Sequence, residues 1–357
     1  MTVKDIVSIK NWSTLDEESK IKITKHIAAT WKKIGFPFYT LTEKEQNKEF
    51  AKLQNYDCSN VIEGNLIKQT MHGLALAWSY FPKSWEVQCS NMMTPMEIWN
   101  SEELFFKALK KRLSRGGFYY DSDGLPGITA SSLRKGLKTF SGTQSVSNFR
   151  PTAAAAIYNK YAGDGIVYDM SCGYGGRLLG AIISNKVKRY IGTDPSSEIT
   201  SGLKNIKAQF GNKEIELHQV GSEDFISNEK VDLCFTSPPY FNTEKYSVEP
   251  TQSYIKFSTL EEWKEGFLRQ TIANCYESLK LNGYLILNVA NVKSYKTFEA
   301  DTLEIAQDEG FVLIDTLNLM LSNISKGGYK TEPIFVFQKF NQIKKVCLLE
   351  VCTIEEM

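Results

Sequence analysis

GIVYDMSCGYGGR, at residues 165–177, is typical of a buried β-strand that turns sharply into a helix. Ile166, Val167 and Tyr168 are strand-forming residues, and the glycines after them let the backbone approach a ligand closely. The free N–H groups at the start of the helix would then face that ligand. The spacing GxGG differs from the dinucleotide-binding GxGxxG, so the turn by itself fits a ligand site and a ligand-free tight turn equally well.

Strand-like and helical segments alternate downstream of this turn. Strands are predicted at residues 165–170, 190–193, 215–220, 231–235, 284–289, 311–317 and 334–338, with helices between them at 177–184 and 261–279 among others. This alternation predicts an α/β fold, with a mostly parallel, seven-stranded sheet and helices on both faces. Ligands on such a sheet bind at the carboxyl ends of its strands, where the strand order reverses.

Acidic residues stand at the ends of the next two predicted strands. Asp194 follows Gly173 by 21 residues, which suits a carboxylate that accepts hydrogen bonds from the ribose hydroxyls of an adenosine ligand. Glu223 and Asp224 end the third strand, and either would accept a hydrogen bond from the adenine amino group. Each acid taken alone is also a common helix N-cap. Their occurrence in order at successive strand ends favours a nucleoside-binding edge.

The fourth predicted strand, VDLCFT at residues 231–236, runs directly into Ser237, Pro238, Pro239 and Tyr240. Neither proline can donate a hydrogen bond to a β-ladder, so the strand stops and the chain continues as a rigid, extended turn. A proline pair elsewhere can be no more than a stiff loop. This tetrapeptide is the most specific feature of the sequence.

Composition excludes several classes of protein. The chain has 357 residues, of which 42% are hydrophobic and 12% aromatic, which predicts about two folded domains rather than disorder. No apolar run approaches the ~18 residues of a membrane span, and the first residues lack an apolar signal-peptide core. The seven cysteines form no CxxC pair and the three histidines are far apart. We therefore expect no disulfide framework and no metal site.

The region before residue 140 is mainly helical in pattern. Helices are predicted at residues 18–33, 94–115 and 131–139, with a glycine-rich loop at 116–127. Thr94, followed by Pro95 and Glu97, is typical of the start of a helix.

Basic residues gather in this N-terminal half. Residues 1–150 hold 21 Lys and Arg against 15 Asp and Glu, which leaves 21 against 26 for residues 151–357. Most of the excess comes from one basic stretch, Lys107, Lys110, Lys111, Arg112, Arg115, Arg134, Lys135 and Lys138. The stretch suits a phosphate-binding surface, but the solvated face of an ordinary helix has the same composition.

Together these motifs resemble motifs I to IV of the class I S-adenosylmethionine-dependent DNA amino-methyltransferases, which methylate N4 of cytosine or N6 of adenine. A fifth element, NFRPT at residues 148–152, resembles the family's motif X, which lies against the methionine part of the cofactor. The resemblance covers about residues 147–340. It implies a Rossmann-like class I methyltransferase fold, S-adenosylmethionine as cofactor and DNA as partner.

The resemblance also assigns roles to residues. The Ser237 side chain and the Pro238 carbonyl would accept the two hydrogens of the target amine, and Tyr240 would stack on a base flipped out of the duplex. The predicted catalytic set is Ser237, Pro238, Pro239 and Tyr240. The residues expected to contact the cofactor are Phe149, Arg150, Pro151, Thr152, Asp169, Ser171, Cys172, Gly173, Gly175, Asp194, Pro195, Glu223, Asp224 and Ser237.

Motif order predicts the domain organisation. Only 64 residues separate Gly173 from Ser237, too few for a recognition domain between motifs I and IV. We expect a mainly helical, DNA-binding domain at residues 1–140, a methyltransferase domain at 141–345 and a C-terminal tail at 346–357. The motifs favour the phosphate-binding interpretation of the basic stretch. The residues expected to contact DNA are Lys107, Lys110, Lys111, Arg112, Arg115, Arg134, Lys135, Lys138, Phe241 and Tyr246.

Several alternatives stay open. Ser237, preceded by Thr236, favours N4 of cytosine over N6 of adenine as the target. A class I methyltransferase that acts on RNA or on a protein amide nitrogen is an alternative, as is a non-catalytic, cofactor-binding partner subunit. The sequence also resembles phage-associated modification methylases. That resemblance implies a cytoplasmic location in a bacterial cell or phage-infected host and a cognate restriction nuclease as an optional partner.

Overall fold

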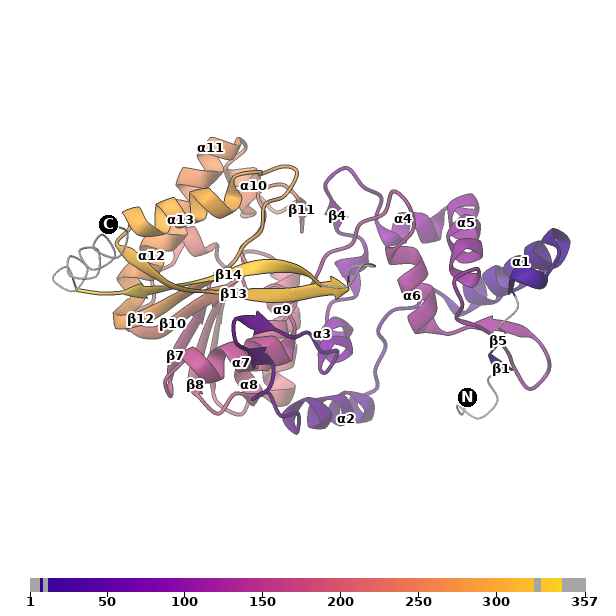
Figure 1. Cartoon of the computed structure of the whole chain (residues 1–357), viewed down its shortest axis with the longest axis horizontal. Coiled ribbons are helices and arrows are strands. Elements are labelled where there is room, and N and C mark those ends of the chain that lie inside the picture. Colours follow the sequence, from indigo (N-terminus) through magenta and orange to yellow (C-terminus); the bar gives the residue numbers. More distant parts are fainter. Residues whose placement is uncertain (1–6, 9–11, 324–328, 342–357) are drawn as a thin grey trace. The chain divides into compact units, whose positions relative to one another are not determined.

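The computed structural model describes residues 7–8, 12–323 and 329–341 (Figure 1). The chain divides into two units, the first made of Met1–Thr40 and Pro82–Val146 and the second of Leu41–Phe81 and Ser147–Met357. The predicted boundary after residue 140 lies close to one of these divisions. The N-terminal domain is not continuous, however, because residues 41–81 pack with the second unit. The predicted tail at residues 346–357 lies outside the described residues.

The first unit combines short helices with a small sheet. Its helices are η2 (Trp12–Thr14), α1 (Glu17–Ile34), η3 (Pro82–Trp85), α4 (Pro95–Asn100), α5 (Glu102–Leu113) and α6 (Ala130–Lys138), and it also supplies β4 (Gln88–Cys89). The antiparallel strands β1 (Val7–Ser8), β5 (Phe118–Tyr120) and β6 (Pro126–Ile128) form the sheet. The prediction of a plain loop at 116–127 is therefore wrong. Phe118 and Ile128 pair across a hairpin and are both buried in the core of the unit.

The helix predicted over residues 94–115 is in fact two helices. The predicted start is confirmed, because the Thr94 hydroxyl accepts a hydrogen bond from the Glu97 N–H at 3.1 Å and the Glu97 carboxylate accepts one from the Thr94 N–H at 2.7 Å. Ser101 then takes an extended backbone, and its hydroxyl accepts from the Leu104 N–H. Ser101 therefore ends α4 and caps α5. Because of this break, the ring centroids of Trp99 and Phe105 lie 4.6 Å apart in the core.

Residues 41–81 contribute four elements to the second unit, α2 (Glu43–Gln54), β2 (Ile62–Glu63), β3 (Leu66–Ile67) and α3 (Leu74–Ser79). Aromatic packing attaches them. The Phe50 ring stacks on Phe210 at 4.3 Å, and Phe81 lies so close to Gly202 that a Cβ at that glycine would come within 2.2 Å of the ring. Helical periodicity cannot reveal which core such a segment joins, and this is why residues 41–81 were predicted to belong with the N-terminal domain.

All seven predicted strands are present in the second unit. They are β7 (Gly165–Asp169), β8 (Val187–Thr193), β9 (Glu214–His218), β10 (Val231–Thr236), β12 (Leu279–Asn288), β13 (Phe311–Asn323) and β14 (Tyr329–Lys339). The sheet order is β2-β3-β13-β14-β12-β10-β7-β8-β9. It has nine strands rather than seven, because the β2–β3 hairpin pairs with the edge of β13. Only β14 and β2 run antiparallel to their neighbours in this sheet of described residues, which is the Rossmann-like methyltransferase architecture predicted from the sequence.

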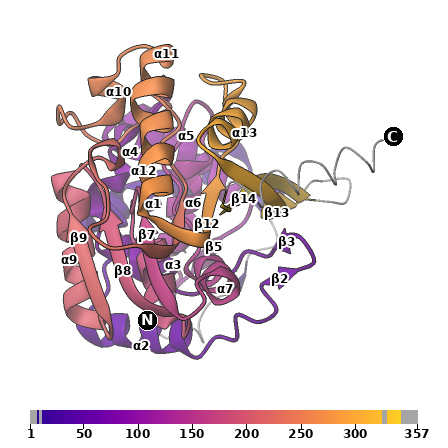
Figure 2. The same cartoon turned by 90° about the vertical axis from the view of Figure 1, so that its left-hand side faces the viewer.

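Helices cover both faces of this sheet, as predicted. The longer helices are α7 (Pro151–Tyr161), α8 (Gly176–Ile183), α9 (Ser197–Phe210), α12 (Gln270–Ser278) and α13 (Phe298–Asp308). The shorter helices are η4 (Ser222–Asp224), α10 (Ser253–Lys256), α11 (Leu260–Trp263) and the π-helical η5 (Lys264–Arg269). The two-residue strand β11 (Glu244–Lys245) lies between η4 and α10 in the sequence. Figure 1 shows α13 above β13 and β14, and α7 and α8 below these two strands. Figure 2 shows α9 beside β8 and β9. Successive β10 residues face opposite layers, since Phe235 packs on Tyr158 of α7 whereas Cys234 joins the core around Trp263.

The strand order reverses at β7. The chain runs from β7 to β8 and β9 on one side, whereas β10 pairs with β7 on the other. Leu233 and Cys234 of β10 lie opposite Val167 and Tyr168 of β7 in parallel register. The carboxyl ends of these two strands therefore meet at the point where open α/β sheets bind ligands.

Three features complete the fold. In the described ranges, no helix is both long enough and apolar enough to cross a membrane. The same residues contain no group of three or more His, Cys, Asp and Glu that could hold a metal ion. The five cysteines that the structure describes are buried free thiols.

Candidate active site

Asp169 ends β7 and organises the glycine-rich turn. It is completely buried, and its Oδ2 accepts hydrogen bonds from Arg177 Nε at 2.9 Å and from the Tyr190 hydroxyl at 2.8 Å. Its Oδ1 accepts from the Thr236 hydroxyl at 3.0 Å. Because these partners come from α8, β8 and β10, one carboxylate joins three elements around the turn. Both of its oxygens are used within the protein, so Asp169 positions the predicted cofactor site rather than offering a free acceptor.

Arg177 is the counter-ion of Asp169. Its side chain is 5% exposed, and its guanidinium also donates to the Ser171 carbonyl. Burial works against the charged form, but the carboxylate beside it outweighs burial and raises the pKa of Arg177. The guanidinium lies 5.9 Å from the ring centroids of both Phe149 and Phe235. This buried ion pair fixes the path of the turn.

Asp194 follows β8 and faces the same turn. Its carboxylate accepts from the Gly173 N–H at 3.0 Å and from the Ser196 N–H at 3.1 Å. Gly173 and Gly175 have φ angles of 54° and 72°, in the left-handed region that favours glycine. Burial raises the pKa of Asp194 to about 6, although the two N–H donors lower it in part. Each oxygen retains a lone pair, so the carboxylate can accept two further hydrogen bonds.

The segment 148–152 lies directly against the glycine-rich turn. Asn148 Nδ2 donates to the Tyr174 carbonyl at 2.8 Å. A Cβ on Gly176 would come within 1.9 Å of the Phe149 carbonyl oxygen, so only glycine permits this approach. Pro151 begins α7 and is buried, and the Thr152 hydroxyl shares a hydrogen bond with Thr70 at 2.8 Å. The elements predicted as motifs X and I are therefore in contact.

Three further predicted cofactor residues lie in the same loops. The Cys172 N–H donates to the Thr193 carbonyl at 3.0 Å, and burial raises the pKa of the Cys172 thiol well above its ordinary value. Arg150 Nε donates to Gln69 at 3.3 Å. The Pro195 carbonyl accepts from the Thr251 hydroxyl at 3.2 Å.

Glu223 and Asp224 form η4 after β9, at the same edge of the sheet. Lys256 lies between them, with its Nζ 2.5 Å from Glu223 Oε1 and 2.5 Å from Asp224 Oδ2. Glu223 is buried, and its Oε2 has no hydrogen-bond partner among the described residues. Burial raises the pKa of Glu223, and the ammonium of Lys256 opposes that shift. An acceptor at this depth is suited to an amino group of a bound ligand.

The turn Ser237–Tyr240, predicted to be catalytic and called the catalytic turn for that reason, continues from β10 beside the glycine-rich turn. Thr236, the last residue of β10, contacts Asp169 as described and also the Ser171 carbonyl at 3.4 Å. The Tyr240 hydroxyl donates to the Asn288 carbonyl at 3.4 Å, and its ring lies edge-on to Phe298 at 5.3 Å. Burial raises the pKa of the Tyr240 phenol well above its ordinary value, so the ring is neutral.

The structure corrects one of the two aromatic DNA contacts that were predicted after the catalytic turn. Phe241 takes a φ of 51° and is buried in the core, 6.0 Å from Trp263, so its ring cannot meet a base. The positive φ turns its side chain inward. Tyr246 is half-buried, its hydroxyl donates to Glu244 at 2.8 Å and its ring lies 6.1 Å from Tyr174 of the glycine-rich turn.

Most of the predicted phosphate-binding residues of the first unit have partners inside that unit. Lys110 pairs with Glu17 at 2.8 Å, Lys107 pairs with Glu103, and the ammonium groups of Lys111 and Lys138 lie over the Phe140 and Trp85 rings. Arg112 Nε donates to the Ser132 hydroxyl at 2.9 Å, and Arg134 donates to the carbonyls of Pro37 and Phe38. Arg134 and Arg112 are thus built into the packing of the helices. The exposed side chains of Arg115 and Lys135 have no hydrogen bond or ion pair to any residue that the structure describes.

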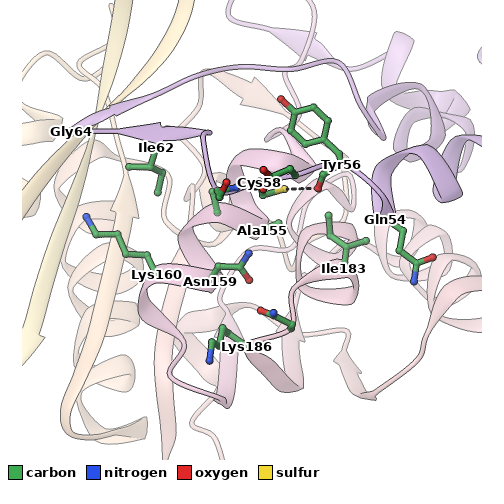
Figure 3. Close-up of a pocket in the computed structure, with 14 residues that line it drawn as sticks. Gln54, Tyr56, Cys58, Ile62, Gly64, Ala155, Asn159, Lys160, Ile183 and Lys186 are labelled. Carbon is green, nitrogen blue, oxygen red and sulfur yellow. Dashed lines mark hydrogen bonds between the residues drawn. The ribbon is translucent and has the colours of Figure 1, made fainter.

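A groove of about 680 Å³ opens elsewhere on the second unit, between residues 54–64 and the helices α7 and α8 (Figure 3). Lys160 and Lys186 line it, but they pair with Asp315 at 3.6 Å and Asp164 at 3.0 Å. Lys186 directly precedes β8, so the groove lies at the amino ends of the strands, away from the residues described above. It contains none of the predicted site residues.

Sequence reasoning missed three residues of this site. Arg177 and Thr236 each adjoin a predicted motif, so position alone would have pointed to them. Lys256 lies in the segment after the catalytic turn, where only aromatic residues were considered. No local signal marks it, because its partners are more than 30 residues away in the chain.

Comparison with known proteins adds one family. Residues 231–346, less than half of the chain, match the model of a DNA methylase family. No curated protein matches the chain.

Solved structures that resemble the chain include the N-methyltransferase NodS from Bradyrhizobium japonicum WM9 (11% identity, 52% of this chain and 93% of that chain, TM-score 0.39). They also include magnesium protoporphyrin IX methyltransferase from Synechocystis PCC 6803 (15% identity, 53% of this chain and 77% of that chain, TM-score 0.38). A third is an S-adenosylmethionine-dependent O-methyltransferase from Thermotoga maritima (13% identity, 66% of this chain and 82% of that chain, TM-score 0.39).

Proposed function

We propose that this chain is a DNA methyltransferase that transfers a methyl group from S-adenosylmethionine to an exocyclic amino group of a flipped base, with N4 of cytosine favoured over N6 of adenine. One observation carries the proposal. The turn Ser237–Tyr240 leaves β10 beside the glycine-rich turn of β7, at the point where the strand order reverses, and Thr236 joins the two turns through Asp169. The DNA methylase match begins at Val231, the first residue of that strand.

The residues at the sheet edge fit S-adenosylmethionine. The carboxylate of Asp194 retains lone pairs for the two ribose hydroxyls, and Glu223 Oε2 is a buried acceptor without a partner, as the adenine amino group requires. The close approach of Phe149 to Gly176 places segment 148–152 beside the turn, where the methionine part would lie. When bound, the cofactor supplies an electrophilic methyl group on its sulfonium.

The catalytic turn performs the remaining tasks. The lone pair of an amino group on an aromatic base is delocalised into the ring, so the amine is a poor nucleophile. Acceptors at the Ser237 hydroxyl and the Pro238 carbonyl would hold both amine hydrogens and favour a pyramidal nitrogen aimed at the methyl group. The Tyr240 ring would stack on the flipped base, which repays part of the few kcal/mol spent on unstacking it. The proton leaves after methyl transfer, so no histidine or cysteine base is needed.

Cations of the first unit and the segment after the catalytic turn would supply the contacts to DNA. Arg115 and Lys135 are available for phosphate contacts, and half-buried Tyr246 lies beside the glycine-rich turn. We further propose, from sequence resemblance, that the protein is a phage-associated modification enzyme, with or without a cognate restriction nuclease.

A methyl-transfer assay tests this function. The protein is incubated with tritiated S-adenosylmethionine and either mixed-sequence duplex DNA or a cell extract, and the product is treated with DNase, RNase or protease before counting. We expect DNase-sensitive label that Ser237→Ala reduces at least ~100-fold, since loss of a transition-state acceptor costs roughly 2.7–4 kcal/mol. Ser258→Ala, which removes an exposed hydroxyl bonded to Glu262, is the matched control and keeps full activity. Base-resolved sequencing of the product then separates N4-methylcytosine from N6-methyladenine.

Absence of label above the Ser237→Ala background would reject the proposal. Label that resists DNase but not RNase or protease would move the substrate to RNA or protein.

A further inference from the structure

The segment after the catalytic turn is tied to the predicted cofactor loops at three points. We call residues 247–256 the strap. The Glu249 carboxylate accepts from the Ser197 N–H at 3.2 Å, at the start of α9. The Thr251 hydroxyl donates to the Pro195 carbonyl. The third tie is Lys256, which reaches both Glu223 and Asp224.

The Lys256 tie differs from the others because it is an ion pair with a buried partner. The side chain of Glu223 is 2% exposed and that of Lys256 is 26% exposed, whereas Asp224 is 58% exposed. A charge-assisted bond at 2.5 Å to a buried carboxylate is much stronger than a bond between exposed groups. The strap is therefore anchored most firmly at Glu223.

The ammonium also sets what Glu223 can do. The charged groups that act on Glu223 are Lys256, which favours its ionised form, and Asp224, which opposes it together with burial. Without Lys256, a carboxylate at this depth would take up a proton rather than stay charged and unpaired. A protonated carboxyl can donate a hydrogen bond to a carbonyl, whereas an ionised one can only accept. Glu223 Oε2, the partnerless oxygen, is the atom whose character would change.

We infer that Lys256 is a positioning residue that holds Glu223 as an acceptor for the amino group of the cofactor's adenine and thereby couples adenine recognition to the strap. This inference rests on the proposed function. The selectivity for adenine would then depend on Lys256, a residue of the strap that belongs to none of the sequence motifs.

Two ligands that differ at one position test it. S-adenosylhomocysteine carries the adenine amino group, and S-inosylhomocysteine carries a carbonyl in its place. We expect calorimetry to show that the natural chain binds the adenosine ligand at least about tenfold more tightly, because an ionised carboxylate bonds the amine and repels the carbonyl. In Lys256→Met the ratio should fall to about threefold or less. Lys256→Arg, which keeps the charge, should restore most of it.

Two controls separate this role from a structural one. Thr251→Val removes another tie of the strap and should leave the ratio unchanged, even if it weakens both ligands equally. Glu223→Gln should lower the ratio while the strap keeps its ties through Glu249, Thr251 and the pair of Lys256 with Asp224, and it replaces Lys256→Met if that variant does not fold. An unchanged ratio in folded Lys256→Met, or in Glu223→Gln where it serves as the replacement, would overturn the inference.

Failure of the proposed function gives a different result. If the natural chain binds neither ligand and transfers no methyl group, the proposed function and this inference both fall. If it binds S-adenosylhomocysteine and methylates DNA, but Lys256→Met keeps the natural ratio, only the inference falls.

Discussion

The carboxyl edge of the sheet in the second unit and the basic helices α5 and α6 of the first unit both concentrate charge, but they hold it differently. At the sheet edge, Asp169 and Arg177 are 0% and 5% exposed and share further hydrogen bonds with β8, β10 and the glycine-rich turn. On α5, Lys107 and Glu103 are 57% and 74% exposed and pair with each other within one helix. Charge at the sheet edge is part of the architecture, whereas charge on the helix surface can be changed at little cost to the fold.

The largest effect should follow from breaking the buried pair. Arg177→Met removes the counter-ion of Asp169 and leaves a buried carboxyl group without its charged partner, and we expect the free energy of unfolding to fall by about 3–5 kcal/mol. Lys107→Met, on the surface pair, should cost less than about 1 kcal/mol. Urea unfolding followed by circular dichroism measures both. Equal losses in the two variants would erase the contrast between the regions.

The second effect concerns Asp194 and pH. Because burial raises its pKa to about 6, the carboxylate that would accept from the ribose hydroxyls is lost as the pH falls through 6. Affinity for S-adenosylhomocysteine should be flat above pH 7 and should fall about tenfold for each unit below 6. Asp194→Asn should weaken binding by about 1.5–3 kcal/mol and remove this dependence. Asp164→Asn, at the opposite end of the sheet, should preserve the natural profile in calorimetry.

The raised pKa of Asp194 has the opposite effect on the stability of the ligand-free protein. The folded pKa of Asp194 lies above its ordinary value of 3.8, so the folded state binds the proton more tightly than the unfolded state does. This group therefore contributes stability below pH ~4 that is lost as the pH rises through 6. Cofactor affinity and ligand-free stability should thus change in opposite directions over this window.

These contrasts explain what the sequence could predict. The placement of Asp194, Glu223 and the Ser237–Tyr240 turn at one edge of the sheet was predictable, because parallel strands bring successive strand ends to the same edge whatever the details of packing. Lys256 was not predictable, because its acids lie 33 and 32 residues away and nothing local marks the pairing. Arg134 was assigned to phosphate binding because its charge is visible in the sequence, whereas the carbonyls that engage it, 96 and 97 residues away, are not.

The fold shows the same limit. Alternation identified all seven main strands, but it could not show that residues 62–67 add two more, because a two-residue strand carries no periodicity. The hairpin finds its partner at the edge of β13, which lies far from it in the sequence.

A matched pair of glycines sharpens the comparison further. In Gly176→Ala the new Cβ would meet the Phe149 backbone carbonyl at 1.9 Å, so segment 148–152 must move. We expect a loss of about 1–3 kcal/mol in unfolding free energy and weaker binding of S-adenosylhomocysteine. In Gly136→Ala on α6 the nearest atom is Arg112 Cβ, at 2.9 Å, so a shift of a few tenths of an ångström between α5 and α6 is enough. The gain in helix propensity of up to about 1 kcal/mol offsets part of this cost, and we expect a smaller loss than in Gly176→Ala. A loss for Gly136→Ala as large as that for Gly176→Ala would show that the two regions are equally rigid.

The smallest effect is expected on the surface of the first unit, and it distinguishes charges that hold the fold from charges that hold DNA. Arg115→Gln and Lys135→Gln remove exposed cations without partners among the described residues, so unfolding free energies should change by less than about 0.5 kcal/mol. Affinity for a duplex, measured by fluorescence anisotropy from about 50 to 200 mM salt, should fall severalfold for each, and the slope of log affinity against log salt should flatten by about 1.

Lys204→Gln on α9, an equal change of charge on an exposed helix of the second unit, should leave the slope unchanged. If all three variants flatten the slope equally, then net charge alone governs the binding of DNA. If only Arg115 and Lys135 do so, the basic helices contact the phosphates through the few cations that the fold has left unpaired.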